Sequence, residues 1–240
     1  SLYNLRAQDF GMRLSDVVLI GFEPGPNPVV GQAELFRAAL ERIRQMPGVD
    51  GATEIQTTPF AGHHVLPIGV PGRAEPPSVN GQLPYLIAAT PEFLRILGID
   101  IAEGRPFTRD DERGAPVVIV NQTMARTVWP GESALGKCIR IGFDPSFDPF
   151  TATGPPGPPT NVPCREVIGV SRDVRQRSVV PGGVEDRLMQ YFVPLLQVPG
   201  PPAGIGPPPG VQGLLVRTKS AAEDLVTPIR RAVLDGRADL

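Results

Sequence analysis

Apolar and polar residues recur with the periods of helices and strands along most of the chain. The apolar run 16–24 predicts a buried strand that Pro and Gly stop. Segment 31–48 predicts a helix, because its apolar residues fall on one helical face and Pro47-Gly48 follows. Segment 49–60 resembles a returning strand, so this part predicts a β-α-β unit whose two strands are parallel, either adjacent or split around a third. The expected apolar face of the helix comprises Leu35, Phe36, Ala39, Leu40 and Ile43.

The C-terminal part predicts a second, incomplete copy of this unit. Residues 212–219 are typical of a strand, and Ser220 is the expected N-cap of the helix that follows. Leu225, Ile229 and Val233 recur at helical spacing in that helix. Its returning strand is expected beyond Leu240. Two such units at the two ends of the chain indicate one split subdomain with an insertion.

The middle of the chain predicts a mixed α/β arrangement. Residues 82–99 predict a strand and a short helix with Thr90 as its N-cap. The β-branched run 117–120 predicts a fully buried strand, and Asn121 is expected to cap the next helix. Pro130-Gly131 is expected to break that helix. A single helical turn over 132–137, strands from Cys138 and Cys164, and a last strand over 189–195 complete this part.

Trp129, the only Trp in the chain, raises the question of an active-site loop. Its spacing after Ala125 and Val128 favours a core anchor at the helix end, and the alternative is an exposed aromatic for a partner. Pro130 then stops the helix, and Gly136 is expected to release the chain into the strand at Cys138. The glycosylation sequon at Asn121 is interpreted as accidental, because the N-cap role accounts for this residue.

Composition narrows the classes of protein that fit. The net charge of −2 and the sparse aromatic residues argue against a nucleic-acid partner. No apolar run approaches the length of a membrane span. Many of the 30 Pro and 27 Gly lie in 153–163 and 198–210, which predict exposed connections. Both ends of the sequence resemble cuts through a larger protein.

Candidate chemistry is sparse. His63 and His64 are adjacent, with no third ligand at metal spacing, and are interpreted as a polar loop. The acidic stretch 107–114 lacks the spacing of a calcium loop and is interpreted as a solvated turn. No nucleotide-binding glycine motif occurs. We therefore expect no catalytic residue, no cofactor and no metal, and hence no enzyme. Cys138 and Cys164 could form a disulfide across the hairpin loop, or they could be two buried free thiols.

A series of motifs resembles a known family, the MacB-like periplasmic core domain of MacB/FtsX-type ABC transporter permeases. Their order and spacing match over roughly residues 80–195, and the flanking segments agree more loosely. The matching segments are Phe93 to Ile99, Gly104 to Phe107, Val117 to Asn121, Ala125 to Pro130, Gly136 to Ile141 and Val167 to Arg175. The loops 143–163 and 198–210 depart from the family by their length and Pro content.

The resemblance implies an α+β fold in two subdomains. A porter-like subdomain of two β-α-β units would comprise residues 1–78 and 198–240, truncated before its last strand. An inserted Sabre-like α/β subdomain would comprise residues 79–197. The implied extracytoplasmic compartment is oxidising, which makes a Cys138–Cys164 bridge chemically reasonable.

The resemblance also implies a function and partners. The chain would be the non-catalytic periplasmic domain of an inner-membrane permease, coupling cytoplasmic ATP hydrolysis to export or other work by mechanotransmission. Its partners would be its own transmembrane helices, a second permease copy or half that completes a dimer, a cytoplasmic ATP-binding subunit, and a membrane fusion protein or other periplasmic protein. The alternatives are a free-standing periplasmic or secreted binding module of the same fold, and a hydrolase built around His63 or His64.

Overall fold

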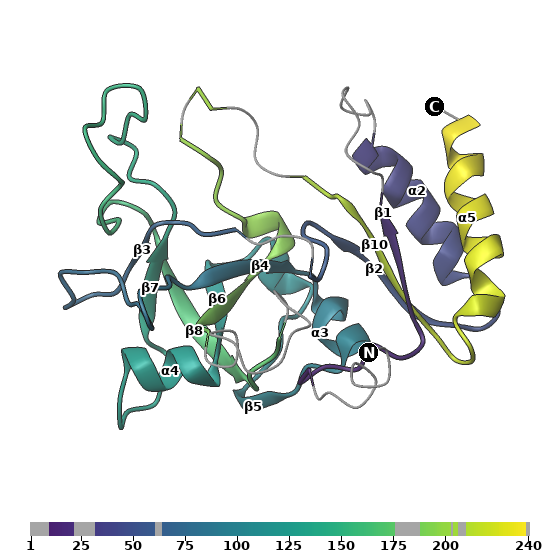
Figure 1. The fold of residues 1–240 in the computed structure, drawn as a ribbon, viewed down its shortest axis with the longest axis horizontal. Coiled ribbons are helices and arrows are strands. Elements are labelled where there is room, and N and C mark those ends of the chain that lie inside the picture. Colours follow the sequence, from purple (N-terminus) through teal and green to yellow (C-terminus); the bar gives the residue numbers. More distant parts are fainter. Residues whose placement is uncertain are drawn as a thin grey trace.

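The computed structural model describes residues 10–21, 32–60, 64–175, 188–202, 204–205 and 210–238, and these form two β-sheets with helices between and outside them (Figure 1). The α+β class predicted from the sequence is confirmed. The helices are α2 (Gln32–Arg44), α3 (Pro91–Leu97), α4 (Gln122–Val128) and α5 (Glu223–Ala238), with 3-10 turns η1 (Asp110–Glu112) and η3 (Leu195–Gln197). The strands are β1 (Val17–Gly21), β2 (Val49–Ile55), β3 (Ile68–Gly69), β4 (Tyr85–Ala89), β5 (Ile101–Gly104), β6 (Val117–Asn121), β7 (Cys138–Ile141), β8 (Cys164–Ser171), β9 (Gln190–Pro194) and β10 (Gly213–Thr218).

The smaller sheet joins the two ends of the chain. Its strand order is β1-β10-β2, and β10 is antiparallel to both neighbours. β1 and β2 are therefore parallel and split around a third strand, which was one of the two arrangements expected for the N-terminal β-α-β unit. Helices α2 and α5 cover one face of this sheet (Figure 1). The apolar face predicted for α2 is buried there: Leu35, Phe36, Ala39, Leu40 and Ile43.

Helix α5 begins at Glu223, three residues after the expected N-cap at Ser220. The chain before the helix is tied to the sheet instead. The Thr218 hydroxyl donates to the Ser220 carbonyl at 2.6 Å, and the Lys219 N–H donates to the Gly48 carbonyl at 2.8 Å. One local and one tertiary hydrogen bond thus hold residues 218–220 in a turn before the helix. Ile229 and Val233 are buried against the sheet, in agreement with the predicted spacing.

The larger sheet is mixed, with strand order β3-β7-β8-β6-β9-β4 and β5 paired beside β8. The central strands β6 and β9 are buried along their whole length, which explains why their sequences are mostly apolar on both faces. α3 packs on one face of this sheet and α4 on the other. β3 pairs with β7, although its residues lie within the segment 1–78 that was assigned to the other subdomain.

Helix α3 lies between the two sheets and joins them through one core (Figure 1). Ile55 of β2 and Leu215 of β10 share this core with Phe93 and Ile96 of α3 and with residues of the larger sheet. Thr90 occupies the N-cap position of α3, but its side chain makes no capping hydrogen bond. Its hydroxyl pairs instead with the buried Thr53 hydroxyl on β2, so the expected cap is wrong in its chemistry.

Candidate functional site

Asn121 ends β6 and begins α4, and its side chain connects three parts of the larger sheet. Oδ1 accepts from the Met124 N–H at 2.9 Å, which is the N-cap bond, and from the Gln190 N–H at 3.0 Å. Nδ2 donates to the Leu188 carbonyl at 2.9 Å. With 1% of its surface exposed, Asn121 is inaccessible as a glycosylation site. It holds the start of α4 against β9.

A second contact fixes the first turn of α4. The Thr123 N–H and hydroxyl donate to the two carboxylate oxygens of Asp173, at 2.8 and 2.9 Å. Arg126 contacts the same carboxylate at 3.1 Å. Asp173 was not predicted as a partner of α4, because it lies 50 residues after Thr123 and only the register between β6 and β8 brings it close.

Trp129 ends α4 and is buried, with 9% of its surface exposed. Its backbone N–H donates to the Ala125 carbonyl at 3.0 Å, and its side chain packs in the core under α4. Pro130 and Gly131 follow on the surface. A shallow hollow of about 350 Å³ adjoins them, lined by Glu103, Arg126, Trp129 and Glu132 among others. The burial favours the anchor interpretation over the exposed aromatic.

The helical turn expected over 132–137 is absent, and the chain crosses this segment as turns. Gly136 has a φ of 73°, a conformation that side chains with a Cβ rarely adopt. Its N–H donates to the Val167 carbonyl at 2.9 Å, one residue beyond the point where β7 stops pairing with β8. The Arg105 N–H donates to the next carbonyl, Ile168, at 3.0 Å. Here β8 changes its partner from β7 to β5.

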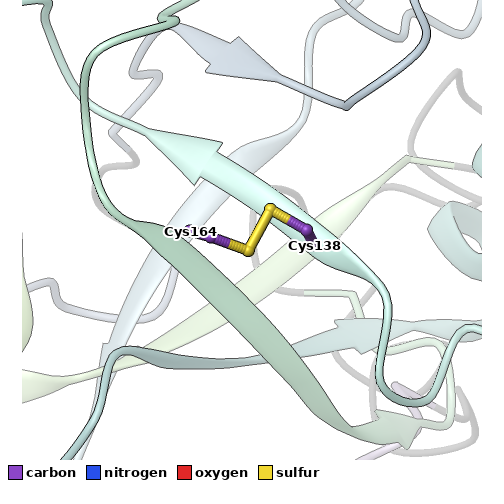
Figure 2. The surroundings of a disulfide bond; sticks show 2 residues. All are labelled: Cys138 and Cys164. Atoms are coloured by element: carbon purple, nitrogen blue, oxygen red, sulfur yellow. A yellow bond between two sulfur atoms is a disulfide. The ribbon is translucent and has the colours of Figure 1, made fainter.

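Cys138 and Cys164 lie at the starts of β7 and β8, and the structure joins them as a disulfide with an S–S distance of 2.08 Å (Figure 2). The bond closes the base of the Pro-rich loop 143–163. Within that loop the Asp144 carboxylate accepts from the N–H groups of Thr160 and Asn161, at 3.0 and 2.6 Å. The loop is therefore ordered by its own hydrogen bonds as well as by the disulfide.

The acidic stretch 107–114 is mostly exposed, as expected for a solvated turn, but Asp111 is buried, with 8% of its surface exposed. Both of its oxygens accept from the Arg105 guanidinium, at 2.6 and 2.9 Å, and the Thr108 N–H donates to it at 2.7 Å. These bonds, led by the one from Arg105, lower the pKa of Asp111 from 3.8 to about 2. The Arg105–Asp111 ion pair therefore has a structural role: it holds η1 against the residue that follows β5.

We expect Asp111→Asn to weaken the fold at neutral pH and to have less effect in acid. A carboxyl with a depressed folded-state pKa stabilises the protein above its unfolded pKa, and that stability is lost as the pH falls from about 4 toward 2. The variant should lose about 1–2 kcal/mol at pH 7, with the difference from the parent shrinking below pH 4. Urea unfolding of both proteins between pH 2.5 and 7 measures this difference.

Subtracting the unfolding free energy of the variant from that of the parent removes the contributions of the carboxyl groups that both proteins contain. Burial and the neighbouring Glu92 raise the pKa of Glu112, so its contribution has the opposite sign and is common to both proteins. A difference that stays constant between pH 2.5 and 7 would contradict the role of the Arg105–Asp111 pair.

Arg217 on β10 fastens the smaller sheet to α3 and to the chain before β1. Its guanidinium donates to three main-chain carbonyl groups: Ile96 at 2.6 Å, Ser15 at 3.1 Å and Arg13 at 2.7 Å. Arg95 of α3 adds an ion pair with Asp50 of β2 at 3.3 Å. The two sheets are thus linked by polar contacts at the edge of their common core.

The described residues that were considered for catalysis or metal binding do not form a common site. His63 lies outside the described residues, and His64 forms a backbone bridge with Leu86. Among the residues that the structure describes, no group of three His, Cys, Asp or Glu side chains could hold a metal ion. Within the same residues, no helix has the length and apolar character to cross a bilayer.

Comparisons with known proteins agree with this fold. Residues 3–226 match the family model of the MacB-like periplasmic core domain. The extracellular domain of the noncanonic ABC-type transporter YknZ from Gram-positive bacteria superposes with a TM-score of 0.55 at 16% identity, covering 92% of this chain and 95% of that one. The periplasmic region of MacB from Actinobacillus actinomycetemcomitans gives a TM-score of 0.52 at 13% identity, covering 96% and 86%. No curated protein sequence matches the chain.

Proposed function

Because this chain belongs to the family of MacB-like periplasmic core domains, we propose that it transmits mechanical work outside the membrane for an ABC transporter permease. The family match over residues 3–226 is the observation that carries the proposal. ATP would be hydrolysed by a separate cytoplasmic subunit or domain, and this domain would move relative to that of a second permease copy. It would catalyse nothing itself and would lie on the extracytoplasmic side of the inner membrane.

We propose that the two subdomains have different roles in this transmission. The porter-like part (1–78 and 198–240) would carry the links to the membrane, and the inserted part (79–197) would present the working surface. A displacement of one subdomain is transmitted to the other only if the connection between them is rigid. The core around α3 and the hydrogen bond from Arg217 to the Ile96 carbonyl support such a link, because buried apolar packing and charge-assisted bonds resist displacement.

The test follows the motion of both parts in the complete transporter. Spin labels are attached at Ser133→Cys in the larger sheet region and, separately, at Glu223→Cys on α5, both exposed positions. The distance between the two copies is then measured with ADP and with ATP trapped on the ATPase. We expect both distances to change with the nucleotide. A nucleotide-independent distance at both positions would contradict mechanotransmission.

Arg217→Gln should uncouple the two parts. The variant loses the side-chain hydrogen bond from β10 to the Ile96 carbonyl of α3, so the nucleotide-dependent change at Ser133→Cys should shrink while that at Glu223→Cys persists. Arg172→Gln is the matched control, because Arg172 is exposed and makes a long ion pair of 3.8 Å with Asp100. Equal changes at both labels in the Arg217 variant would show that this residue does not transmit the motion.

A further inference from the structure

The Cys138–Cys164 disulfide lies on the outer face of the β7–β8 hairpin. Cys138 and Arg140 alternate along β7 with Ile139 and Ile141, which are buried in the core under α4. The two cysteines therefore point away from that core. Figure 2 shows the two sulfur atoms bridging the strands across the hairpin.

The bond is accessible from one side in particular. Cys164 is exposed, whereas Cys138 is half-buried. In the ladder Cys164 faces Arg140, and Cys138 faces Glu166. A thiolate that approaches from solvent thus meets the exposed Cys164 first, and the positive charge of Arg140, its partner in the ladder, favours approach to that side.

Other contacts besides the disulfide hold the β7–β8 hairpin together. The β7–β8 ladder continues through Ile139 and Arg140, and Ile139 is fully buried. The Asp144 carboxylate holds Thr160 and Asn161 across the base of the loop. These contacts would keep the hairpin paired after the bond opens, so opening requires no unfolding.

We propose that this disulfide is a site of thiol–disulfide exchange in the folded protein, with Cys164 Sγ as the atom attacked by a protein dithiol of the Cys-x-x-Cys class. The attacking thiolate forms a bond to Cys164 Sγ, and the bond to Cys138 Sγ breaks. Cys138 leaves as a thiolate and takes a proton from water. The second thiol of the partner then attacks the mixed disulfide and releases Cys164. The partner dithiol is oxidised to a disulfide, and the cysteine pair is reduced to two thiols.

The experiment traps the mixed disulfide. The 240-residue chain is purified without reductant and mixed with a thioredoxin-type protein whose second active-site Cys is replaced by Ser, so that it attacks but cannot resolve the product. Peptide mass mapping then identifies the attached cysteine. We expect attachment to Cys164 to exceed attachment to Cys138 by about tenfold. Two free thiols in the starting protein, equal attachment, a preference for Cys138, or no adduct would each overturn the proposal.

Two controls separate exchange in the folded state from exchange through unfolding. The rate of adduct formation should change by less than about twofold in urea below the unfolding transition; a rate that rises with the unfolded fraction would overturn the proposal. Arg140→Gln should slow the attack by about two- to fivefold, because one positive charge beside Cys164 is lost. Arg172→Gln, a charge change on an exposed residue outside the hairpin, should leave the rate unchanged, and an equal effect of both variants would remove Arg140 from the proposal.

Discussion

Replacement of Asn121 by Ala should lower the free energy of unfolding by about 3–5 kcal/mol, a large share of the stability of a domain this size. The variant loses the N-cap bond of α4 and leaves the Gln190 N–H and the Leu188 carbonyl without this buried partner. A buried main-chain group that loses its partner costs more than the hydrogen bond itself contributed. Urea unfolding followed by circular dichroism measures the change.

The adjacent Gln122 offers a matched control. It is half-buried at the first position of α4 and has no part in the Asn121 hydrogen bonds, so Gln122→Ala should change stability by less than about 0.5 kcal/mol. Similar losses of unfolding free energy in the two variants would show that any substitution at the start of α4 destabilises the protein, whatever hydrogen bonds it removes. The Asn121 side chain would then not connect α4 to β9 as described.

Trp129→Ala should also cost about 3–5 kcal/mol, because a large buried ring is removed from the core under α4 and leaves a cavity. Trp129→Phe retains most of the apolar volume and should lose about 1–2 kcal/mol. Since Trp129 is the only Trp, unfolding is followed by circular dichroism rather than by fluorescence.

Phe150→Ala is the comparison for an exposed aromatic residue. Phe150 lies in the Pro-rich loop with 72% of its surface exposed, so its truncation should stay within about 0.5 kcal/mol of the parent. If Trp129→Ala were equally mild, Trp129 would not anchor the end of α4. A partner-binding role for the ring would then become the better explanation.

The features that the sequence predicted depend on residues close together in the chain. The buried face of α2 follows from the helical period, and the Asn121 N-cap follows from its place between a β-branched run and a helix. The end of α4 at Trp129 follows from Pro130-Gly131. In each case local chemistry and the tertiary structure favour the same arrangement, so the pattern alone is sufficient.

The features that the sequence did not predict depend on distant partners. Thr90 has the residue type and position of an N-cap, but the Thr53 hydroxyl from another sheet competes for its side chain. Asp173 and Arg217 resemble ordinary surface charges in the sequence, and their partners become evident only when strands far apart are in register. Such contacts set the orientation of α4 and of the two sheets, which is why the candidate site was only partly predictable.

The central place of β10 in the smaller sheet has a consequence for synthesis. Val17 of β1 pairs with Arg217 of β10, about two hundred residues later in the chain. Among the described residues, β1 and β2 have no other strand partner than β10. During vectorial synthesis β1 and β2 therefore cannot complete their pairing until residues 213–218 have emerged. This high contact order predicts that the larger sheet folds first and that β1 and β2 remain open to mispairing or chaperone binding until β10 inserts between them.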